Sequence, residues 1–343
     1  MKSQINWGFI GCGHVVETKS GMAFNNVKNS AIHAIMRRNI NVARDSAIKL
    51  NANKWYDNIR DLLSDNKVDA IYIATPPGLH YEQALECCHA NKPVYIEKPF
   101  TRNYDEAVKI VKCFEQKNIP LFVAHYRRAL PRFIKIKNII DNGEIGNVMG
   151  IDFQLFRKYS KKDTVAKWLY DPVLSGGGKF YDIAPHAIDI IIFLFGDIVE
   201  VQGYATNNNT NYLVEDFVVM SFKTKNNVLG TANFNLLANE KKDRMVVYGD
   251  NGKLEFSIHD NDQIIITKER QQTILEIMSP PLIEQPMVET VVKELTGVGK
   301  CPCTGREALP TVKVMDLVLS DYYNGRNDAF WDRPTTWKFG KEK

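Results

Sequence analysis

Short, unbroken apolar runs alternate with amphipathic helical patterns along the first part of the chain. Such runs are typical of strands whose two sheet faces are both covered by helices. Their alternation with helices predicts an α/β fold built on a doubly wound parallel sheet with right-handed crossovers. The predicted strands are 5–10, 31–36, 68–74, 93–96 and 121–124, and the predicted helices are 42–50, 79–90 and 104–117.

Strand patterns dominate from residue 148 onward, after a helix at 131–142 that Gly143 should end. Asn226-Asn227 and Asp250-Asn251-Gly252 are typical of hairpin turns, which join antiparallel strands. We therefore expect an α+β region with a large, mostly antiparallel open sheet. Its predicted strands are 148–156, 199–205, 214–223, 228–235, 244–248, 252–256 and 263–267, and its helices are 180–195, 285–295 and 306–323.

The charge pattern argues against a nucleic-acid or membrane protein. The 44 Lys and Arg residues barely outnumber the 40 Asp and Glu residues. Basic pairs such as Lys161-Lys162 and Lys241-Lys242 are scattered and form no stripe. No run reaches the roughly 18 apolar residues of a membrane span, and the first apolar run begins too early to follow a signal peptide. We expect a cytoplasmic protein that binds neither nucleic acid nor membrane.

The six cysteines show no metal-binding spacing. Cys87-Cys88 and Cys301-Pro302-Cys303 are the close groups, and neither has a second half at the distance that a zinc site needs. The histidines also lack metal-ligand spacing. The sequence therefore predicts reduced structural thiols, as is usual in the cytosol, and no metal site.

A glycine turn, Gly11-Cys12-Gly13-His14-Val15-Val16, joins the first predicted strand to a helix. Gly11 permits the tight turn, and Gly13 lets the backbone approach a pyrophosphate that the helix N-terminus attracts. Val16 replaces the third glycine of the dinucleotide-binding pattern, so helix and strand should lie slightly further apart. The turn predicts a nicotinamide-dinucleotide site in which Gly11, Gly13, His14 and Val15 contact the cofactor.

The end of the second predicted strand indicates which cofactor binds. Sites for NAD place Asp or Glu about 20 residues after the glycines, to accept hydrogen bonds from the ribose 2′-OH. Here the segment carries Arg37 and Arg38, and Asp45 is the next carboxylate. Two guanidinium groups suit a 2′-phosphate, because one can pair with it and one can stack on adenine. We predict that NADP binds, with NAD as the alternative. The competing structural explanation is that Arg37 and Arg38 are a solvated surface pair at the end of a strand.

Two domains are expected, because the 343 residues exceed the roughly 250–300 at which single cores stop growing. The glycine turn and the alternating pattern assign residues 1–124 to a Rossmann-type dinucleotide-binding domain. Residues 125–343 form the α+β domain, which should bind the substrate and support oligomerisation. Its last helices could pack back on the first domain.

Four further segments, together with the glycine turn, resemble the Gfo/Idh/MocA oxidoreductases, the glucose–fructose oxidoreductase and inositol dehydrogenase family. They lie in family order and extend the similarity over nearly the whole chain. The most specific part is Glu97-Lys98-Pro99 followed at this distance by a Gly-Gly-Gly-x-x-x-Asp-x-x-x-His pattern. The resemblance implies an open sheet that makes oligomer contacts, hence a homodimer or homotetramer. The segments are 74–80, 97–99, 141–146 and 176–189.

The resemblance also implies a catalytic group of Lys98, Asp182 and His186. His186 matches the acid/base histidine, and Lys98 matches the lysine that holds the reacting oxygen near the nicotinamide. Trp168 lies where relatives place a Trp-Arg pair near the cofactor or substrate, although Leu169 replaces the arginine here. The other residues assigned to the cofactor are Thr75, Pro76, His80, Glu97, Lys98 and Arg127.

The residues themselves support the same chemistry. Asp182 and His186 are four positions apart on one predicted helix, so Asp182 can orient an imidazole that exchanges a proton near neutral pH. Lys98 follows the strand at 93–96, at the carboxyl edge where parallel sheets bind ligands, and its cation can stabilise a developing alkoxide. A satisfied structural histidine and a solvated lysine are the competing explanations.

The sequence thus predicts an NADP-dependent oxidoreductase that moves a hydride between nicotinamide and a hydroxyl or keto carbon of a sugar, polyol or related small molecule. Two alternatives stay open. One is a nicotinamide-dependent glycosidase with a transient redox cycle, and the other is a non-enzymatic regulator that senses the cofactor. Substrate contacts are expected from the loop at 157–168 and from the strands after 199.

Overall fold

The computed structural model describes residues 2–158, 167–208 and 211–338. The described chain divides into two compact units, each made of segments that are separate in the sequence. The N-terminal unit contains Met1–Thr101, Glu106–Leu130 and Pro280–Leu309. The C-terminal unit contains Arg102–Asp105, Pro131–Ser279 and Pro310–Lys343. In the described parts of the chain, no helix combines the length and apolar character needed to cross a membrane.

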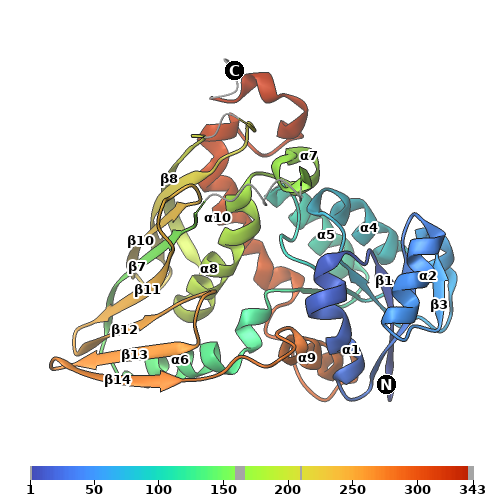
Figure 1. Ribbon diagram of the computed structural model, residues 1–343, viewed down its shortest axis with the longest axis horizontal. Coiled ribbons are helices and arrows are strands. Elements are labelled where there is room, and N and C mark those ends of the chain that lie inside the picture. The colour runs from blue at the N-terminus through green and yellow to red at the C-terminus, as the bar shows by residue number, and fades with distance from the viewer. Residues whose placement is uncertain (1, 159–166, 209–210, 339–343) are drawn as a thin grey trace. The chain divides into compact units, whose positions relative to one another are not determined.

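The N-terminal unit is built on a parallel six-stranded sheet with the strand order β3-β2-β1-β4-β5-β6 (Figure 1). The order reverses between β1 and β4, and this switch point opens a crevice at the carboxyl ends of the strands. The strands are β1 Ile5–Ile10, β2 Ser30–Met36, β3 Lys54–Tyr56, β4 Ala70–Ile73, β5 Val94–Ile96 and β6 Leu121–Val123. The helical segments are η1 Val16–Ser20, α1 Gly21–Asn26, α2 Ile40–Lys49, α3 Ile59–Ser64, α4 Pro77–His89, α5 Tyr104–Gln116, η2 Tyr126–Ala129 and α9 Gln285–Leu295.

The apolar runs predicted five of these strands, and their ends are shifted by at most two residues. The doubly wound parallel sheet is confirmed. β3 was missed because it has three residues, two of them exposed, and therefore shows no apolar run. The short helix α3 was missed as well. β3 pairs with the end of β2, and the Arg37 N–H donates to the Tyr56 oxygen at 3.1 Å, so the missed strand supports one edge of the crevice.

A cluster of aromatic rings fixes α1 against the sheet. The ring of Phe24 lies 4.8 Å from that of Phe9, 4.7 Å from that of Tyr72 and 5.0 Å from that of Trp7, measured between centroids. All four side chains are fully buried. Pairs of this kind add about 0.5–1.5 kcal/mol beyond the burial of their area. The helix that follows the glycine turn is therefore held rigidly on β1 and β4.

Asp65 connects three elements at the other end of the sheet. Its carboxylate accepts hydrogen bonds from Tyr56 Oη at 2.9 Å, Lys54 Nζ at 3.2 Å and the Lys67 backbone N–H at 2.9 Å. His33 Nε2 lies 3.1 Å away. Burial alone would raise the pKa of Asp65, but these partners together hold it well below its usual range. The carboxylate is thus charged at neutral pH and acts as a structural centre.

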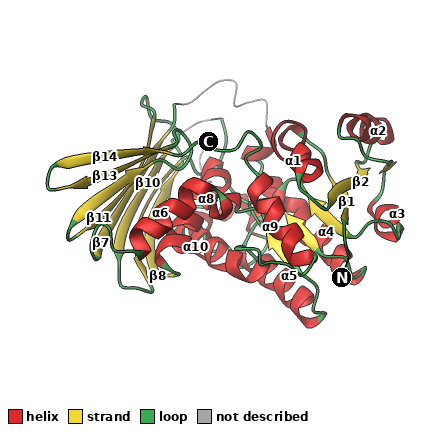
Figure 2. Ribbon diagram, turned by 90° about the horizontal axis from the view of Figure 1, so that it is seen from below, coloured by secondary structure: helices red, strands yellow, loops and turns green. Residues whose placement is uncertain are grey.

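The C-terminal unit is built on an eight-stranded sheet with the order β14-β13-β12-β11-β7-β10-β9-β8. Only the β7–β10 pair of this sheet is parallel, so the predicted, mostly antiparallel architecture is confirmed. α6, α8 and α10 lie on one face, and no described helix lies on the other (Figure 2). The strands are β7 Val148–Phe156, β8 Ile198–Thr206, β9 Phe217–Thr224, β10 Leu229–Asn235, β11 Lys242–Gly249, β12 Gly252–Phe256, β13 Gln263–Lys268 and β14 Gln271–Glu276. The helical segments are α6 Pro131–Asp141, η4 Lys167–Tyr170, α7 Pro172–Ser175, α8 Lys179–Phe195, α10 Gly305–Tyr323, η5 Phe330–Asp332 and η6 Pro334–Thr336.

The last hairpin of this sheet was not predicted. β14 is almost entirely exposed and carries no apolar alternation. Its turn consists of Glu269 and Arg270, which have φ angles of 48° and 70°. Two-residue hairpin turns of this kind usually contain Asn or Gly, so the turn gives no compositional signal. The edge of the sheet is therefore one strand wider than the pattern indicated.

One pair of cysteines corrects the expectation of reduced thiols. Cys88 at the end of α4 and Cys113 in α5 form a disulfide whose Cα atoms are 6.6 Å apart. The prediction of reduced thiols was wrong for these two residues, because the packing of two helices, rather than spacing along the chain, brings the sulfurs together. The other four cysteines, Cys12, Cys87, Cys301 and Cys303, are buried free thiols.

We predict that Asp65→Ala lowers the free energy of unfolding by about 2–4 kcal/mol at neutral pH, because His33, Tyr56 and the Lys67 N–H lose a buried acceptor. Because folding lowers the pKa of Asp65, its carboxylate stabilises the folded state at pH values above the pKa of the unfolded chain, near 3.9. This stabilisation is lost as the pH falls below that value. Urea unfolding at several pH values should show the difference shrinking in acid. Asp45→Ala, at an exposed position, should change little. A loss independent of pH would contradict the assignment.

Candidate active site

In the glycine turn, the first glycine is tightly packed and the second has free space beside it. Gly11 has a φ of +83°, and a Cβ there would lie 2.7 Å from Thr75 Cγ2 and 2.9 Å from the Ala74 oxygen. No heavy atom lies within 4 Å of a Cβ placed on Gly13. The backbone is therefore wedged against the end of β4 at Gly11 and leaves free space over Gly13. This is the shape that a pyrophosphate needs to approach the main chain.

The helix that follows the turn begins at His14 and runs through a π segment, η1, into α1. Val16, at the position of the missing third glycine, is buried in the core. At the end of this π segment the Gly21 N–H donates to the Val16 oxygen. His14 and Val15 are exposed in the first turn, whose backbone N–H groups have no acceptor within the helix. An anion is favoured at this helix end.

A pocket of about 480 Å³ borders the turn. It brings together six of the residues predicted to bind the cofactor: Gly11, Gly13, Arg37, Arg38, Thr75 and Pro76. These residues come from the carboxyl ends of β1, β2 and β4, the edge predicted to bind ligand. Cys12 also borders the pocket, and burial raises the pKa of its thiol to about 11, so it is not a ready nucleophile. The other residues around the pocket are Met36, Asn39, Val42, Ala74, Leu79 and Gln83.

The two arginines at the end of β2 are placed differently. Arg37 is half-buried, donates to Ser46 Oγ at 3.1 Å and lies 3.6 Å from Glu17 Oε1. Glu17 also pairs with Lys49 at 3.2 Å. Arg38 is exposed and has no hydrogen-bond or ion-pair partner among the described residues. The pocket therefore has one anchored cation and one available cation at its edge.

His80 and Glu97 lie behind the pocket wall. His80 is fully buried, with Nε2 2.7 Å from the Thr75 oxygen and Nδ1 3.1 Å from the oxygens of Pro99 and Phe100. Burial lowers its pKa to about 4. Glu97 is also buried and accepts hydrogen bonds from neighbouring groups. His80 thus joins the Thr75 loop to the segment after Lys98, and direct cofactor contact by His80 or Glu97 stays a prediction.

Lys98 and Arg127 occupy the ends of the next two strands. Lys98 follows β5, is half-buried, and precedes Pro99 through a cis peptide bond. Arg127, in η2 after β6, is buried, and its guanidinium lies 4.8 Å from the ring centroid of Tyr126. Both residues lie at the carboxyl edge of the sheet, where the sequence predicted them. Their contacts with a cofactor stay predictions.

In the C-terminal unit, a turn of three glycines leads into α8, which carries Asp182 and His186. Gly176 has a φ of +80°, and a Cβ on Gly178 would lie 2.2 Å from the Glu215 oxygen. Asp182 is half-buried and His186 is buried, one helical turn apart. The imidazole of His186 meets the ring of His259 edge-on, with centroids 5.3 Å apart. The helix therefore presents both predicted catalytic side chains from one turn.

Two buried charged residues hold this glycine turn, and sequence analysis missed both. Glu215 Oε1 accepts the Gly178 N–H at 2.8 Å, and its other oxygen is bonded to Tyr323 Oη. Arg326 donates to the Gly176 oxygen at 2.7 Å and to Asp316 Oδ1 at 2.7 Å. Removing either charged group would release the start of α8. No local pattern in the sequence signals these residues, because they contact the turn from distant segments.

Trp168 lies in η4 and is half-buried. The neighbouring Tyr170 stacks on Tyr212 with ring centroids 4.4 Å apart, beside an aromatic pocket of about 580 Å³. Most of the loop predicted to contact substrate, residues 159–166, lies outside the described residues. The role of Trp168 therefore stays a prediction.

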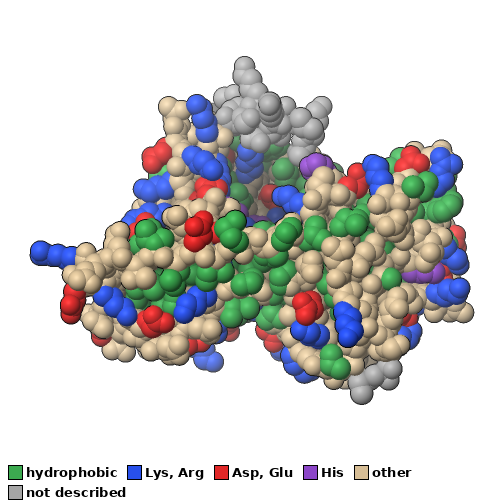
Figure 3. All heavy atoms as spheres, turned by 60° about the horizontal axis from the view of Figure 1, so that its bottom comes forward, with side chains coloured by type: hydrophobic (Ala, Val, Ile, Leu, Met, Phe, Trp, Pro, Cys, Tyr) green, Lys and Arg blue, Asp and Glu red, His purple; other side chains and the backbone are tan. Residues whose placement is uncertain are grey.

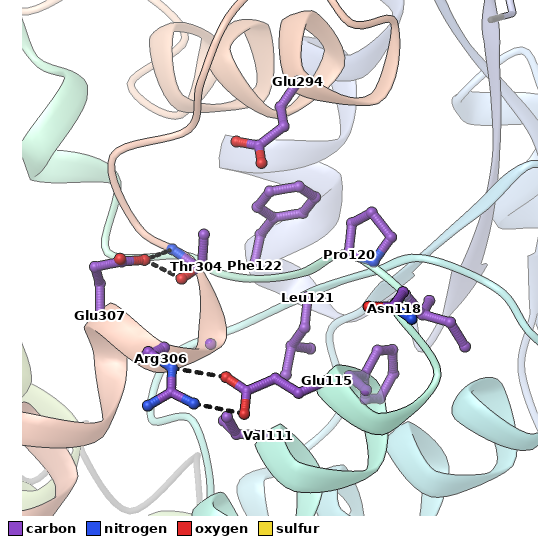
Figure 4. A pocket seen from close by; sticks show the side chains of 13 residues that line it. Val111, Glu115, Asn118, Pro120, Leu121, Phe122, Glu294, Thr304, Arg306 and Glu307 are labelled. Carbon is purple, nitrogen blue, oxygen red and sulfur yellow. Dashed lines mark hydrogen bonds and ion pairs between the residues drawn. The ribbon is translucent and has the colours of Figure 1, made fainter.

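A further pocket of the N-terminal unit, about 480 Å³, is lined by α5, β6 and the start of α10 (Figure 4). Its carboxylates are already engaged. Glu115 forms a two-bond pair with Arg306 at 2.7 and 2.6 Å, and Glu307 accepts the Thr304 N–H at 2.9 Å. Glu294 accepts a backbone N–H at 2.6 Å. These contacts cap and anchor α10, so we assign no chemistry to this pocket.

The described residues contain no group of three His, Cys, Asp or Glu side chains arranged to hold a metal ion. Lys and Arg side chains are interspersed with Asp and Glu side chains on the face shown in Figure 3. This mixture matches the scattered basic residues of the sequence. The glycine-turn pocket, with its cationic edge, is therefore the feature of the N-terminal unit that best suits an anionic dinucleotide.

Comparisons with known proteins agree with this geometry. Residues 5–125 match the oxidoreductase family with an NAD-binding Rossmann fold, and residues 133–255 match the GFO/IDH/MocA C-terminal domain. Oxidoreductase P35 of Formosa agariphila is 36% identical over 322 residues, which cover 92% of this chain and 99% of that protein. The scyllo-inositol 2-dehydrogenase (NADP(+)) IolW of Bacillus subtilis is 29% identical over 138 residues, 40% of this chain and 38% of that protein.

Solved structures share the fold at lower identity. Levoglucosan dehydrogenase in complex with NADH and levoglucosan superimposes with a TM-score of 0.84 at 19% identity, covering 92% of this chain and 96% of that chain. The WlbA dehydrogenase of Bordetella pertussis, in complex with NADH and UDP-GlcNAcA, gives 0.78 at 21% identity, covering 92% and 95%. The two matched domains and the relative that aligns over 99% of its length lead to the same assignment. This chain belongs to the GFO/IDH/MocA family and is an NAD(P)-dependent oxidoreductase.

Proposed function

We propose that this protein uses NADP to move a hydride to or from a hydroxyl or keto carbon of a sugar, polyol or related small molecule. The observation that carries the choice of NADP is Arg38, exposed and without a partner among the described residues, beside Arg37 at the edge of the glycine-turn pocket. A phosphate can engage both guanidinium groups. Glu17, a nearby carboxylate, is paired with Arg37 and Lys49 and does not line the pocket.

The substrate class is supported by the relatives. The curated inositol dehydrogenase is named for NADP(+), and the structurally similar levoglucosan dehydrogenase is described with NADH and a sugar derivative. Both names describe oxidation at a carbinol carbon of a small carbohydrate-derived molecule. The similar structures also include complexes with L-tartaric acid and with UDP-GlcNAcA, so the shared fold does not fix the individual substrate.

We assign the steps to three residues of this chain. The nicotinamide, when bound, supplies the site that accepts or donates hydride. His186 takes the hydroxyl proton during oxidation and returns it during reduction. The Lys98 ammonium stabilises negative charge on the substrate oxygen while the carbon–hydrogen bond breaks or forms. Asp182, one turn before His186 on α8, orients the imidazole.

We also infer a homodimer or homotetramer that forms through the uncovered face of the C-terminal sheet. Tyr204, Leu229 and Ile274 project from this face with 74%, 61% and 56% of their surface exposed. These positions come from β8, β10 and β14, so the apolar groups extend across the sheet. Exposed apolar surface of this extent is typical of a protein–protein interface.

Replacing Arg38 with Ala should weaken NADPH binding by about 1–3 kcal/mol, the usual worth of a charged hydrogen bond, and leave NADH binding nearly unchanged. Titration of each cofactor, followed by nicotinamide fluorescence, measures both affinities. Arg44→Ala removes a cation from an exposed position on α2 outside the pocket and serves as the control. Equal affinity of the wild-type protein for NADPH and NADH would contradict the proposal.

His186→Ala should lower the rate of hydride transfer by about 10²–10⁴-fold, the usual contribution of a general acid–base group, with little change in cofactor affinity. Lys98→Ala should also lower the rate and can weaken substrate binding, because the ammonium contacts the reacting oxygen. Asp182→Asn should be milder. Stopped-flow absorbance with a substrate found among sugars and polyols tests this order. A His186→Ala protein with near-normal transfer would mean that another group handles the proton.

Placing Arg at Tyr204 and Leu229 together should shift the protein toward the monomer, because two charges would be buried in the interface. Val298→Arg, at a residue of the N-terminal unit that is 75% exposed, is the control and should leave the mass unchanged. Light scattering at micromolar concentration gives the mass of each. A monomeric wild-type protein would refute the interface.

A further inference from the structure

A second carboxyl group lies against Glu97, the first residue of the Glu-Lys-Pro motif. Glu284, the residue before α9, is in hydrogen-bond contact with the Glu97 side chain. Both belong to the N-terminal unit, and their residues are 8% and 3% exposed. Two adjacent carboxylates with so little water cannot both be charged without a large penalty. The contact therefore requires at least one proton.

Burial raises the pKa of Glu97, but its hydrogen bonds oppose this shift and make Glu97, rather than Glu284, the partner that carries the charge. Tyr72 Oη lies 2.5 Å from Glu97 Oε1, and the Lys98 backbone N–H donates to Glu97 Oε2 at 3.1 Å. Tyr72 Oη is also 3.0 Å from Ser20 Oγ. Tyr72 has a single proton, so if it donates to Glu97, Ser20 must donate to Tyr72. In this series of hydrogen bonds, from Ser20 to Tyr72 to Glu97, the Glu97 carboxylate is the final acceptor.

The surroundings of Glu284, in contrast, disfavour a charged carboxylate. No N–H or O–H group of a described residue reaches its buried Oε2. Burial and the charge of Glu97 raise the pKa of Glu284 well above its usual range, against the influence of Lys98 and Lys19. An ionised Glu284 would leave a buried oxygen without donors. A protonated Glu284 can instead donate to Glu97.

We propose that Glu97 and Glu284 share one proton, held on Glu284 and donated to Glu97, and that this singly charged pair positions Lys98 and acts as its counterion. The proposal rests on the proposed role of Lys98 at the reacting oxygen. Glu97 fixes the main chain of Lys98 through its N–H, and the single negative charge favours the ammonium form. Glu97 and Glu284 are thus positioning residues.

Among the described residues, the tyrosines beside the pair and the Cys301 thiol titrate above neutral pH. Tyr72 and Tyr95, on adjacent strands, have pKa values raised well above the usual range by burial, so they stay neutral. The thiols beside Tyr95 are buried, and burial raises the pKa of one of them to about 11. A pH effect between pH 5 and 8 should therefore come from the carboxyl pair. The charged or titratable groups that act most strongly on the pair or on Tyr95 are Lys19, Lys98, Tyr72, Tyr95, Cys301 and Cys303.

The first test measures whether the folded pair binds one more proton than the same residues bind in the unfolded chain. Gln at position 284 keeps the shape and can donate an amide N–H to Glu97 without titrating. Unfolded Glu loses its proton near pH 4.3, whereas the folded pair keeps it, so the contribution of the pair to wild-type stability must fall with rising pH. The unfolding constant of the wild type relative to Glu284→Gln should rise up to tenfold per pH unit above about pH 5.

Glu289→Gln, at an exposed position of α9, is the matched control and should give a ratio independent of pH. A ratio for Glu284→Gln that is equally independent of pH would overturn the shared proton. A ratio that falls with rising pH would overturn it as well, because the folded state would then bind fewer protons than the unfolded state.

The second test measures Lys98 directly, with neither cofactor nor substrate. Acetic anhydride labels uncharged amines, and mass spectrometry of the peptide that contains Lys98 gives the fraction labelled at each pH. Glu284→Gln should leave the midpoint of this curve unchanged, because the pair keeps its single charge. The double variant Glu97→Gln, Glu284→Gln should move the midpoint about one pH unit or more toward acid.

Two results would contradict the pair. A Glu284→Gln midpoint shifted as far as that of the double variant would mean that the wild-type pair carries two charges. An unshifted double variant would mean that the pair is not the counterion of Lys98. Loss of hydride transfer plays no part in either readout, so failure of the proposed reaction and failure of this proposal can be told apart.

Discussion

The close passage of Gly11 past the end of β4 is the constraint on which the cofactor pocket depends. A side chain at Gly11 would collide with Thr75 and Ala74, and the φ of +83° also disfavours one. Because the chain closes there, the helix after the turn starts directly over the crevice, with Gly13 open above it. Arg38 reaches the same pocket from the end of β2. The glycine turn and the cation proposed to bind the 2′-phosphate therefore line one cavity.

Buried charges hold the segments that carry the proposed catalytic residues. The Gly178 N–H is bound by Glu215, the Gly176 oxygen by Arg326, and the Lys98 N–H by Glu97. Glycine-rich and proline-containing turns have few side chains to pack, so direct hydrogen bonds to their backbone supply the rigidity that apolar contacts give elsewhere. Such ionic groups are expensive to bury, and their use beside these turns fits a requirement for fixed geometry.

Sequence patterns predicted what is local in this molecule. β1 and β4 are buried on both faces and therefore form unbroken apolar runs, and the glycine turn has a direct steric meaning. The hairpin at Glu269 and Arg270 lacked any such signal, because neither residue is a usual turn former. The Cys88–Cys113 disulfide and the partners of the key turns, Glu284 among them, arise only when distant segments pack together. A single sequence shows the residues but not their neighbours.

Net hydride exchange with a small hydroxylated molecule can be measured most directly with a panel of sugars and polyols. Each is mixed with the protein and NADP⁺, and the absorbance of the reduced nicotinamide is followed over many turnovers. We predict that at least one compound is oxidised with one NADPH formed per molecule, and that its ketone is reduced when NADPH is supplied. Cleavage of a glycosidic bond without net formation of NADPH, or cofactor binding with no turnover of any compound, would contradict it.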